Sequence, residues 1–146
     1  MKESWRSLIA LTAACTVAAT IFGFGSQVFA WRSVYNGLGR EYLIEVTRIF
    51  VYVALGVLLA FRGGWRGVLA AIVMAIVATS AEWVLYPFSY AWATLDDPAG
   101  YADKFGGVRR PPYAQWGGIY DILGVGISAA LAQGLRTMAH VDPRGL

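Results

Sequence analysis

The segment from Val68 to Phe88, VLAAIVMAIVATSAEWVLYPF, is apolar along almost its whole length and carries one charged residue, Glu82. Because an α-helix rises about 1.5 Å per residue, such a segment is long enough to cross the roughly 30 Å hydrocarbon core of a bilayer. Three further segments have the same character, and they run from Leu8 to Ala30, from Leu43 to Phe61 and from Gly118 to Leu135. The sequence therefore predicts an all-α integral membrane protein with four transmembrane helices.

The composition of the chain agrees with this fold class. Of its 146 residues, 58% are hydrophobic and 14% are charged, and the mean hydropathy of +0.53 exceeds what a soluble domain of this size needs for its core. The net charge of +3 comes with no basic stripe, so we expect the lipid bilayer, and no nucleic acid, as a partner. Ten arginines against two lysines, with abundant alanine and glycine, are typical of GC-rich bacterial genomes, so we expect a multi-pass protein of a bacterial cell membrane.

The three connections between the predicted helices differ in length and composition. Residues 31–42 form a short polar loop, residues 62–67 (RGGWRG) a tight turn, and residues 89–117 a long loop rich in aromatic residues. Short connections join antiparallel neighbours, which predicts that the whole chain, 1–146, forms one up-down four-helix bundle. We interpret the long loop as a lid on the lipid headgroups or, alternatively, as a docking surface for a larger membrane protein.

The basic residues favour one orientation of this bundle. The side with both termini and the tight turn carries Lys2, Arg6, Arg62, Arg66, Arg136 and Arg144, and the other side carries Arg32, Arg40, Lys104, Arg109 and Arg110. Because basic residues accumulate on the cytoplasmic side of membrane proteins, we expect both termini in the cytoplasm. Lys2 and Arg6 also precede an apolar run that ends at Val28 and Ala30, as in a secretory signal, so cleavage after Ala30 stays open as an alternative.

Cysteine and histidine are too scarce for the common cofactor and metal sites. Cys15 is the single cysteine and His140 the single histidine, which excludes disulfides, cysteine-rich zinc sites and a haem held by two histidines within one chain. We expect no cofactor, and we interpret Cys15 as a small core residue.

Polar and small residues recur at intervals of three and four, which indicates the face of each helix that looks into the bundle. The predicted inward faces are Thr16, Thr20, Gly23 and Gln27; Glu41, Glu45, Arg48 and Tyr52; Ala75, Thr79, Glu82 and Tyr86; and Asp121, Gly124 and Ser128. The rows of small residues that we interpret as packing contacts between helices are Ala10, Ala14 and Ala18; Ala71 and Ala75; and Gly126, Ala130 and Gly134.

Four charged residues fall inside the predicted spans. Glu45 and Arg48 lie at the start of the second span, Glu82 near the end of the third and Asp121 near the start of the fourth. Because alternate helices run in opposite directions, these charges should share one depth near the outer membrane face. A charge at the centre of a transmembrane helix costs about 2.5 to 3.5 kcal/mol, so such residues are usually paired or functional. The candidate polar-layer or ligand-binding residues are Gln27, Glu45, Arg48, Tyr52, Glu82, Tyr86 and Asp121.

This layer has several open interpretations. Glu45 and Arg48 are three residues apart, so an intrahelical ion pair is the simplest account of these two charges. The remaining carboxylates, Glu82 and Asp121, would then take up protons, bind a cation or pair with an arginine of the loops. In the first interpretation, Arg48 bridges two or three carboxylates as a structural clamp. In the second, the layer binds a cation, a proton or a polar headgroup. Catalysis is disfavoured because no histidine base and no nucleophile with an evident partner lie near the layer.

These observations lead to two functional hypotheses. We expect a non-enzymatic accessory or assembly subunit of a membrane complex, or a homo-oligomer, because short multi-pass chains without cofactor ligands commonly contribute packing surface. The alternative is a protein that binds or transports a cation, a proton or a lipid through the charged layer. No catalytic residue is predicted, and the question of a metal ion stays open.

Overall fold

The computed structural model describes residues 5–105 and 114–139 and, apart from Phe105 and residues 114–117, also their side chains. Within these ranges the chain is helical and contains no strand. The helices are α1 (Trp5–Tyr35), α2 (Glu41–Gly63), α3 (Trp65–Ala93), α4 (Pro98–Phe105) and α5 (Ala114–Ala139). All except α4 are long and apolar enough to cross a membrane, which confirms the predicted helical class and its four apolar segments. Lys2, Arg109, Arg110, His140 and Arg144 lie outside the described residues.

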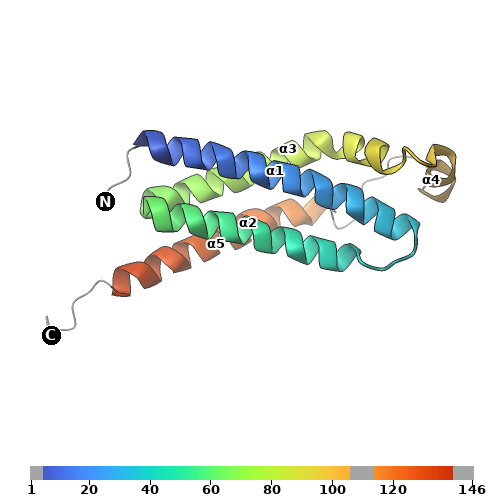
Figure 1. Cartoon of the computed structure of the whole chain (residues 1–146). Helices are drawn as coiled ribbons and strands as arrows, with labels where there is room; N and C mark the ends of the chain where they lie inside the picture. Colours follow the sequence, from blue (N-terminus) through green and yellow to red (C-terminus); the bar gives the residue numbers. More distant parts are fainter. Residues whose placement is uncertain (1–4, 106–113, 140–146) are drawn as a thin grey trace, which may run out of the picture.

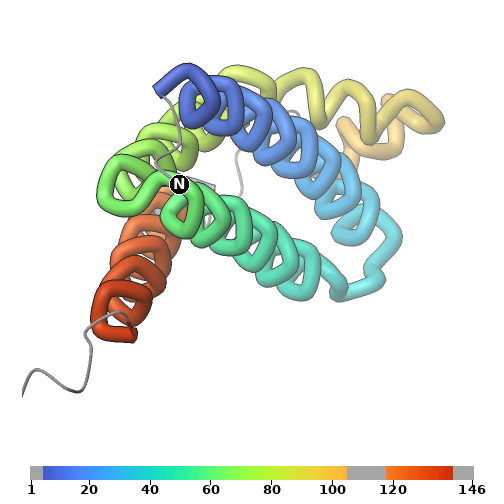
Figure 2. The backbone as a smooth tube through the Cα atoms, turned by 60° about the vertical axis from the view of Figure 1, so that its left-hand side comes forward, coloured from blue at the N-terminus to red at the C-terminus, as the bar shows by residue number. Residues whose placement is uncertain are grey.

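Consecutive long helices run in opposite directions, so α1 and α3 point one way while α2 and α5 point the other (Figure 1). The helices α2 and α3 form the middle of the bundle, since each packs against the other and against both α1 and α5. Figure 2 shows α5 on the side of this pair that faces away from α1. The start of α2, the end of α3 and the start of α5 therefore lie in the same half of the bundle.

The connection between α2 and α3 is a tight turn, as the sequence predicts for residues 62–67. Gly64 alone separates the two helices, and its φ of +63° lies in the left-handed region, where glycine carries no steric cost. Gly67 faces the backbone carbonyl of Leu59 so closely that a Cβ atom at this position would collide with it. Two glycines thus allow α2 and α3 to pack backbone against backbone from the turn onward.

The segment predicted as a long loop, 89–117, is partly helical, and that prediction is wrong in this respect. The helix α3 continues to Ala93, and α5 already begins at Ala114. The helix α4 is started by Asp97, whose Oδ1 accepts a hydrogen bond from the Gly100 amide at 3.1 Å, and by Pro98 in its first position. An aspartate cap followed by proline is a favourable helix start, because the carboxylate accepts a hydrogen bond from an amide of the first turn and proline has no N–H group to leave unpaired.

Small and apolar residues fill the centre of the bundle. Ala19, Leu59, Ala71, Met74 and Val125 are completely buried there, and Cys15 is buried among them, as predicted for a core residue. The outer surface is also apolar, and its side chains include Ile21, Phe50, Leu69 and Leu131, each more than 60% exposed. A surface of this kind on all the long helices is typical of contact with lipid rather than with water.

The predicted inward faces agree with the structure on α3 but only in part on the other helices. Ala75, Thr79, Glu82 and Tyr86 are all buried. On α5, however, the buried row is Asp121, Val125, Ala129 and Gln133, while Gly124 and Ser128 are only half-buried. The row of small residues on α1, Ala10, Ala14 and Ala18, is exposed rather than packed within the bundle. Small residues therefore do not mark an inward face here, because lipid or another helix can cover them equally well.

Candidate functional site

Arg48 lies on the buried face of α2 and is 6% exposed. Its guanidinium group contacts carboxylates from three helices: Nη2 is 2.9 Å from Glu45 Oε2, Nη1 is 2.5 Å from Glu82 Oε2, and Nη2 is 2.9 Å from Asp121 Oδ2. We call Arg48, these three carboxylates and Tyr52 the Arg48 cluster. The cluster connects α2 with α3 and α5 through a single side chain.

Glu82, which is 2% exposed, brings α1 into contact with the same cluster. Its Oε2 accepts the hydrogen bond from Arg48 and lies 3.4 Å from the Gln27 Nε2 donor of α1. Its Oε1 is contacted by the Tyr52 hydroxyl of α2. Both carboxylate oxygens therefore have partners on neighbouring helices, and all four long helices contribute to one polar layer.

Asp121 is the least satisfied member of the cluster, although it is only 1% exposed. Its Oδ2 is within ion-pair distance of Arg48, but the two groups are not aligned for a hydrogen bond. Its Oδ1 is buried and has no hydrogen-bond partner among the described residues. Glu45 Oε2 lies at the same distance of 2.9 Å from the same Nη2 atom, so one guanidinium nitrogen, with its two hydrogens, faces two carboxylates.

Tyr52 is completely buried, and its hydroxyl lies between two acceptors. One is Glu82 Oε1, and the other is the Ala19 carbonyl oxygen of α1 at 3.0 Å. A phenol has a single proton and can donate it to only one of these acceptors at a time. If the proton goes to Ala19, the contact with Glu82 requires a proton on that carboxyl group.

Gly23 allows α1 to approach the cluster closely. A Cβ atom at this position would collide with Glu82 Oε1 and would lie only 2.7 Å from the Tyr52 hydroxyl. The backbone of α1 therefore covers the cluster directly, and no larger residue fits there without moving a charged side chain.

The charges of the cluster do not cancel. Three carboxylates surround one guanidinium group, and with every group ionised two negative charges would remain unbalanced in a largely buried site. Buried charges of this kind are costly unless a proton or a counter-ion neutralises them. Among the described residues no three acidic, cysteine or histidine side chains are arranged to hold a metal ion.

The structure brings six of the seven candidate residues together, and it extends the expected Glu45–Arg48 pair to Glu82 and Asp121. The exception is Tyr86, which lies one turn beyond Glu82 on α3 and packs against Trp31 with 5.9 Å between ring centroids. No sequence signal points to the Ala19 carbonyl, since any residue offers one. Glu41, although predicted on the same face of α2, accepts a hydrogen bond from Ser33 at 3.3 Å instead.

A second polar cluster joins α4 to the end of α1. The Tyr35 hydroxyl donates to Asp97 Oδ2 at 2.5 Å, and the Tyr35 ring is stacked on Tyr101 with 3.8 Å between centroids. These hydrogen bonds, from Tyr35 and from the Gly100 amide, lower the pKa of the Asp97 carboxyl group below its usual range. The Lys104 ammonium group contacts the Tyr35 carbonyl oxygen. The α4 helix is thus attached to α1, at the end of the bundle nearest the Arg48 cluster (Figure 1).

Comparison with known proteins adds no identification to this geometry. No protein-family model, no curated protein and no solved structure matches the chain significantly.

Proposed function

We propose that the four long helices cross a bacterial cell membrane as an up-down bundle with both termini in the cytoplasm. The distribution of charge supports this orientation. The end of the bundle where α1 begins and α5 ends holds Arg6, Arg62, Arg66 and Arg136, whereas the described basic residues at the other end are Arg32, Arg40 and Lys104. In membrane proteins, arginine and lysine accumulate in the short loops and at the helix ends of the cytoplasmic side.

Cysteine labelling in intact cells tests this orientation. In a Cys15→Ala background, Leu38→Cys lies in the α1–α2 loop, and Trp65→Cys lies at the opposite end of the bundle. A membrane-impermeant maleimide should label position 38 in intact cells and position 65 only after the cells are permeabilised. Labelling of both positions from the same side would contradict the up-down arrangement, and the reverse pattern would contradict the orientation.

For its function, we propose that the chain is a non-enzymatic accessory subunit that packs against another membrane-spanning helix through α1. The observation that carries this proposal is the exposed row Ala10, Ala14 and Ala18, which has no covering helix within the described chain. Small residues four apart let two transmembrane helices approach closely, and this is a frequent mode of association in membranes. The Arg48 cluster, in contrast, is turned inward and supports the bundle itself.

Co-purification in a mild detergent tests the subunit proposal. The variant Ala14→Leu should release the partner while the protein itself stays folded, because the added side chain separates the two helix backbones. The matched control is Ala54→Leu, which changes another exposed small residue, on α2, and should retain the partner. A wild-type chain that migrates alone as a monomer would contradict the proposal, as would equal behaviour of the two variants.

A second candidate function, proton binding or transport through the Arg48 cluster, is favoured by the excess of carboxylates around one guanidinium group. In proteoliposomes that contain a pH-sensitive dye, this function requires proton flux that Glu82→Gln and Asp121→Asn abolish in folded protein. Glu41→Gln is the matched control because Glu41 lies outside the cluster and pairs with Ser33. If wild-type protein carries no protons or cations, or if all three variants behave alike, the second candidate is wrong.

A further inference from the structure

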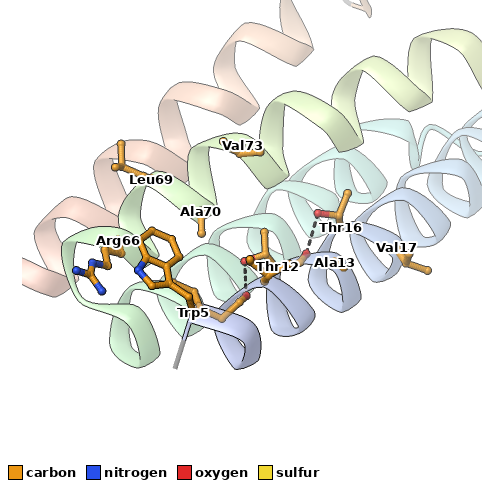
Figure 3. A pocket seen from close by; sticks show the side chains of 11 residues that line it. Trp5, Thr12, Ala13, Thr16, Val17, Arg66, Leu69, Ala70 and Val73 are labelled. Atoms are coloured by element: carbon orange, nitrogen blue, oxygen red, sulfur yellow. Dashed lines mark hydrogen bonds between the residues drawn. The ribbon is translucent and has the colours of Figure 1, made fainter. Parts of the chain in front are cut away.

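The first halves of α1 and α3 enclose an apolar groove of about 570 Å³ (Figure 3). Its walls are formed by Ile9, Ala13 and Val17 from α1 and by Leu69, Ala70 and Val73 from α3. The small side chains of alanine on both walls leave space between the helices. Two threonines also line the groove, but their hydroxyl groups donate to the backbone of their own helix, at 2.7 and 2.8 Å, so they add no unsatisfied polar group to it.

One end of the groove is basic and aromatic. The Arg66 guanidinium carbon lies 4.7 Å from the centre of the Trp5 ring, and both residues are at this end in Figure 3. A guanidinium group over an indole ring keeps its N–H donors in its own plane, where they can still bind a phosphate group. Further arginines, Arg6, Arg62 and Arg136, belong to the same end of the bundle, and no described acidic residue does.

The length of the groove matches one leaflet of a bilayer. From Trp5 to Val17, α1 rises by about 18 Å, since each residue adds about 1.5 Å. Half of a hydrocarbon core of roughly 30 Å is about 15 Å. If Trp5 and Arg66 lie at the membrane interface, the groove therefore reaches about the middle of the bilayer, which is the depth of a single acyl chain.

From these observations we propose that the groove binds one acyl chain of an anionic phospholipid whose phosphate group pairs with Arg66. The proposal rests on the membrane insertion proposed above, but not on the partner subunit or on proton binding. The apolar walls recognise the chain, and the positive charge of Arg66 at the basic end favours a headgroup with a net negative charge. A zwitterionic phospholipid fits the walls equally well but lacks the net charge.

Native mass spectrometry of the full chain, released from detergent micelles, tests this site with two defined lipids. The wild-type protein should bind dioleoyl phosphatidylglycerol at least about tenfold more tightly than dioleoyl phosphatidylcholine. Arg66→Gln should remove most of this preference, whereas Arg40→Gln, an equal change of charge at the other end, should keep it. Ala70→Phe should fill the groove and weaken the binding of both lipids, whereas Ala54→Phe on the outer surface of α2 should not.

Several outcomes would overturn the site. These are equal affinity of the wild-type protein for the two lipids, equal losses in Arg66→Gln and Arg40→Gln, or unchanged binding in the groove-filling variant. If Ala70→Phe does not fold, Ala13→Phe fills the groove from the exposed side of α1 and provides the same test. Extraction of membranes with alkaline carbonate tests membrane insertion separately from lipid binding. A protein that stays in the membrane after this extraction but shows no lipid preference contradicts only the lipid site.

Discussion

Replacing Arg48 with glutamine should lower the free energy of unfolding by about 3 to 5 kcal/mol, the usual cost of breaking a buried ion pair from one side. The variant retains a polar side chain, although a shorter and uncharged one, and it leaves Glu82 and Asp121 buried without a cation. The loss is large because these carboxylates cannot turn to water within the bundle. Equilibrium unfolding in bicelles or in a mild detergent measures this difference.

Arg40→Gln is the matched control for this experiment. Arg40 lies just before α2 and is exposed, so the same change of charge should alter the stability by about 0.5 kcal/mol or less. Equal effects at positions 40 and 48 would mean that Arg48 acts only through the overall charge of the protein. That result would contradict its role as the centre of the cluster.

Gly23→Ala should destabilise the protein by about 1 to 3 kcal/mol, which is typical of overpacking in a dense core. The new methyl group would collide with Glu82 and force either α1 or the carboxylate away from the cluster. Gly25→Ala, two residues farther along α1, is the matched control, because a Cβ atom at that position would meet no other atom within 4 Å. It should be neutral or stabilising by up to about 1 kcal/mol, because alanine is the better helix former.

Thermal unfolding of the two glycine variants in the same detergent gives the comparison directly. A lower melting temperature for Gly23→Ala alone would support close contact between α1 and the cluster. If both variants unfold like the wild-type protein, α1 does not cover Glu82 as the structure has it.

The helical class and the four apolar segments were predictable because hydropathy over some twenty residues is a strong signal that does not depend on tertiary contacts. The shared depth of Glu45, Arg48, Glu82 and Asp121 was predictable for a similar reason, since it follows from alternating helix direction and position in the chain. What the sequence could not determine is how many carboxylates Arg48 reaches. That number depends on helix rotation and spacing, which the pattern of residues defines only loosely.

Tyr86 illustrates this limit. It lies on the same face of α3 as Glu82, but four residues of helix shift it by about 6 Å along the axis, and there it meets Trp31 instead of the cluster. The difference between the predicted and the observed buried face of α5 has a related cause. Asp121 faces inward as predicted, but the buried row continues through Val125 and Ala129 rather than through Gly124 and Ser128, because apolar side chains fill a bundle core equally well.

The short helix α4 has a recognisable start in the sequence. Asp97 followed by Pro98 is a favourable helix start, although the glycine, proline and aromatic residues of the surrounding segment are more typical of a loop. The attachment of α4 to Tyr35 could not have been predicted in this way. It joins residues more than sixty positions apart, and no periodicity connects them.

The most direct test of the Arg48 cluster is a double-mutant cycle. It compares the cost of Arg48→Gln in the wild-type protein with its cost in a background in which Glu82→Gln and Asp121→Asn have removed both buried negative charges. If Arg48 neutralises these carboxylates, the cost of Arg48→Gln should fall from about 3 to 5 kcal/mol to about 1 kcal/mol in the neutral background, because little buried charge is then left unpaired. A cost of Arg48→Gln that is the same in both backgrounds would contradict the cluster as the interaction that fastens α2 to α3 and α5.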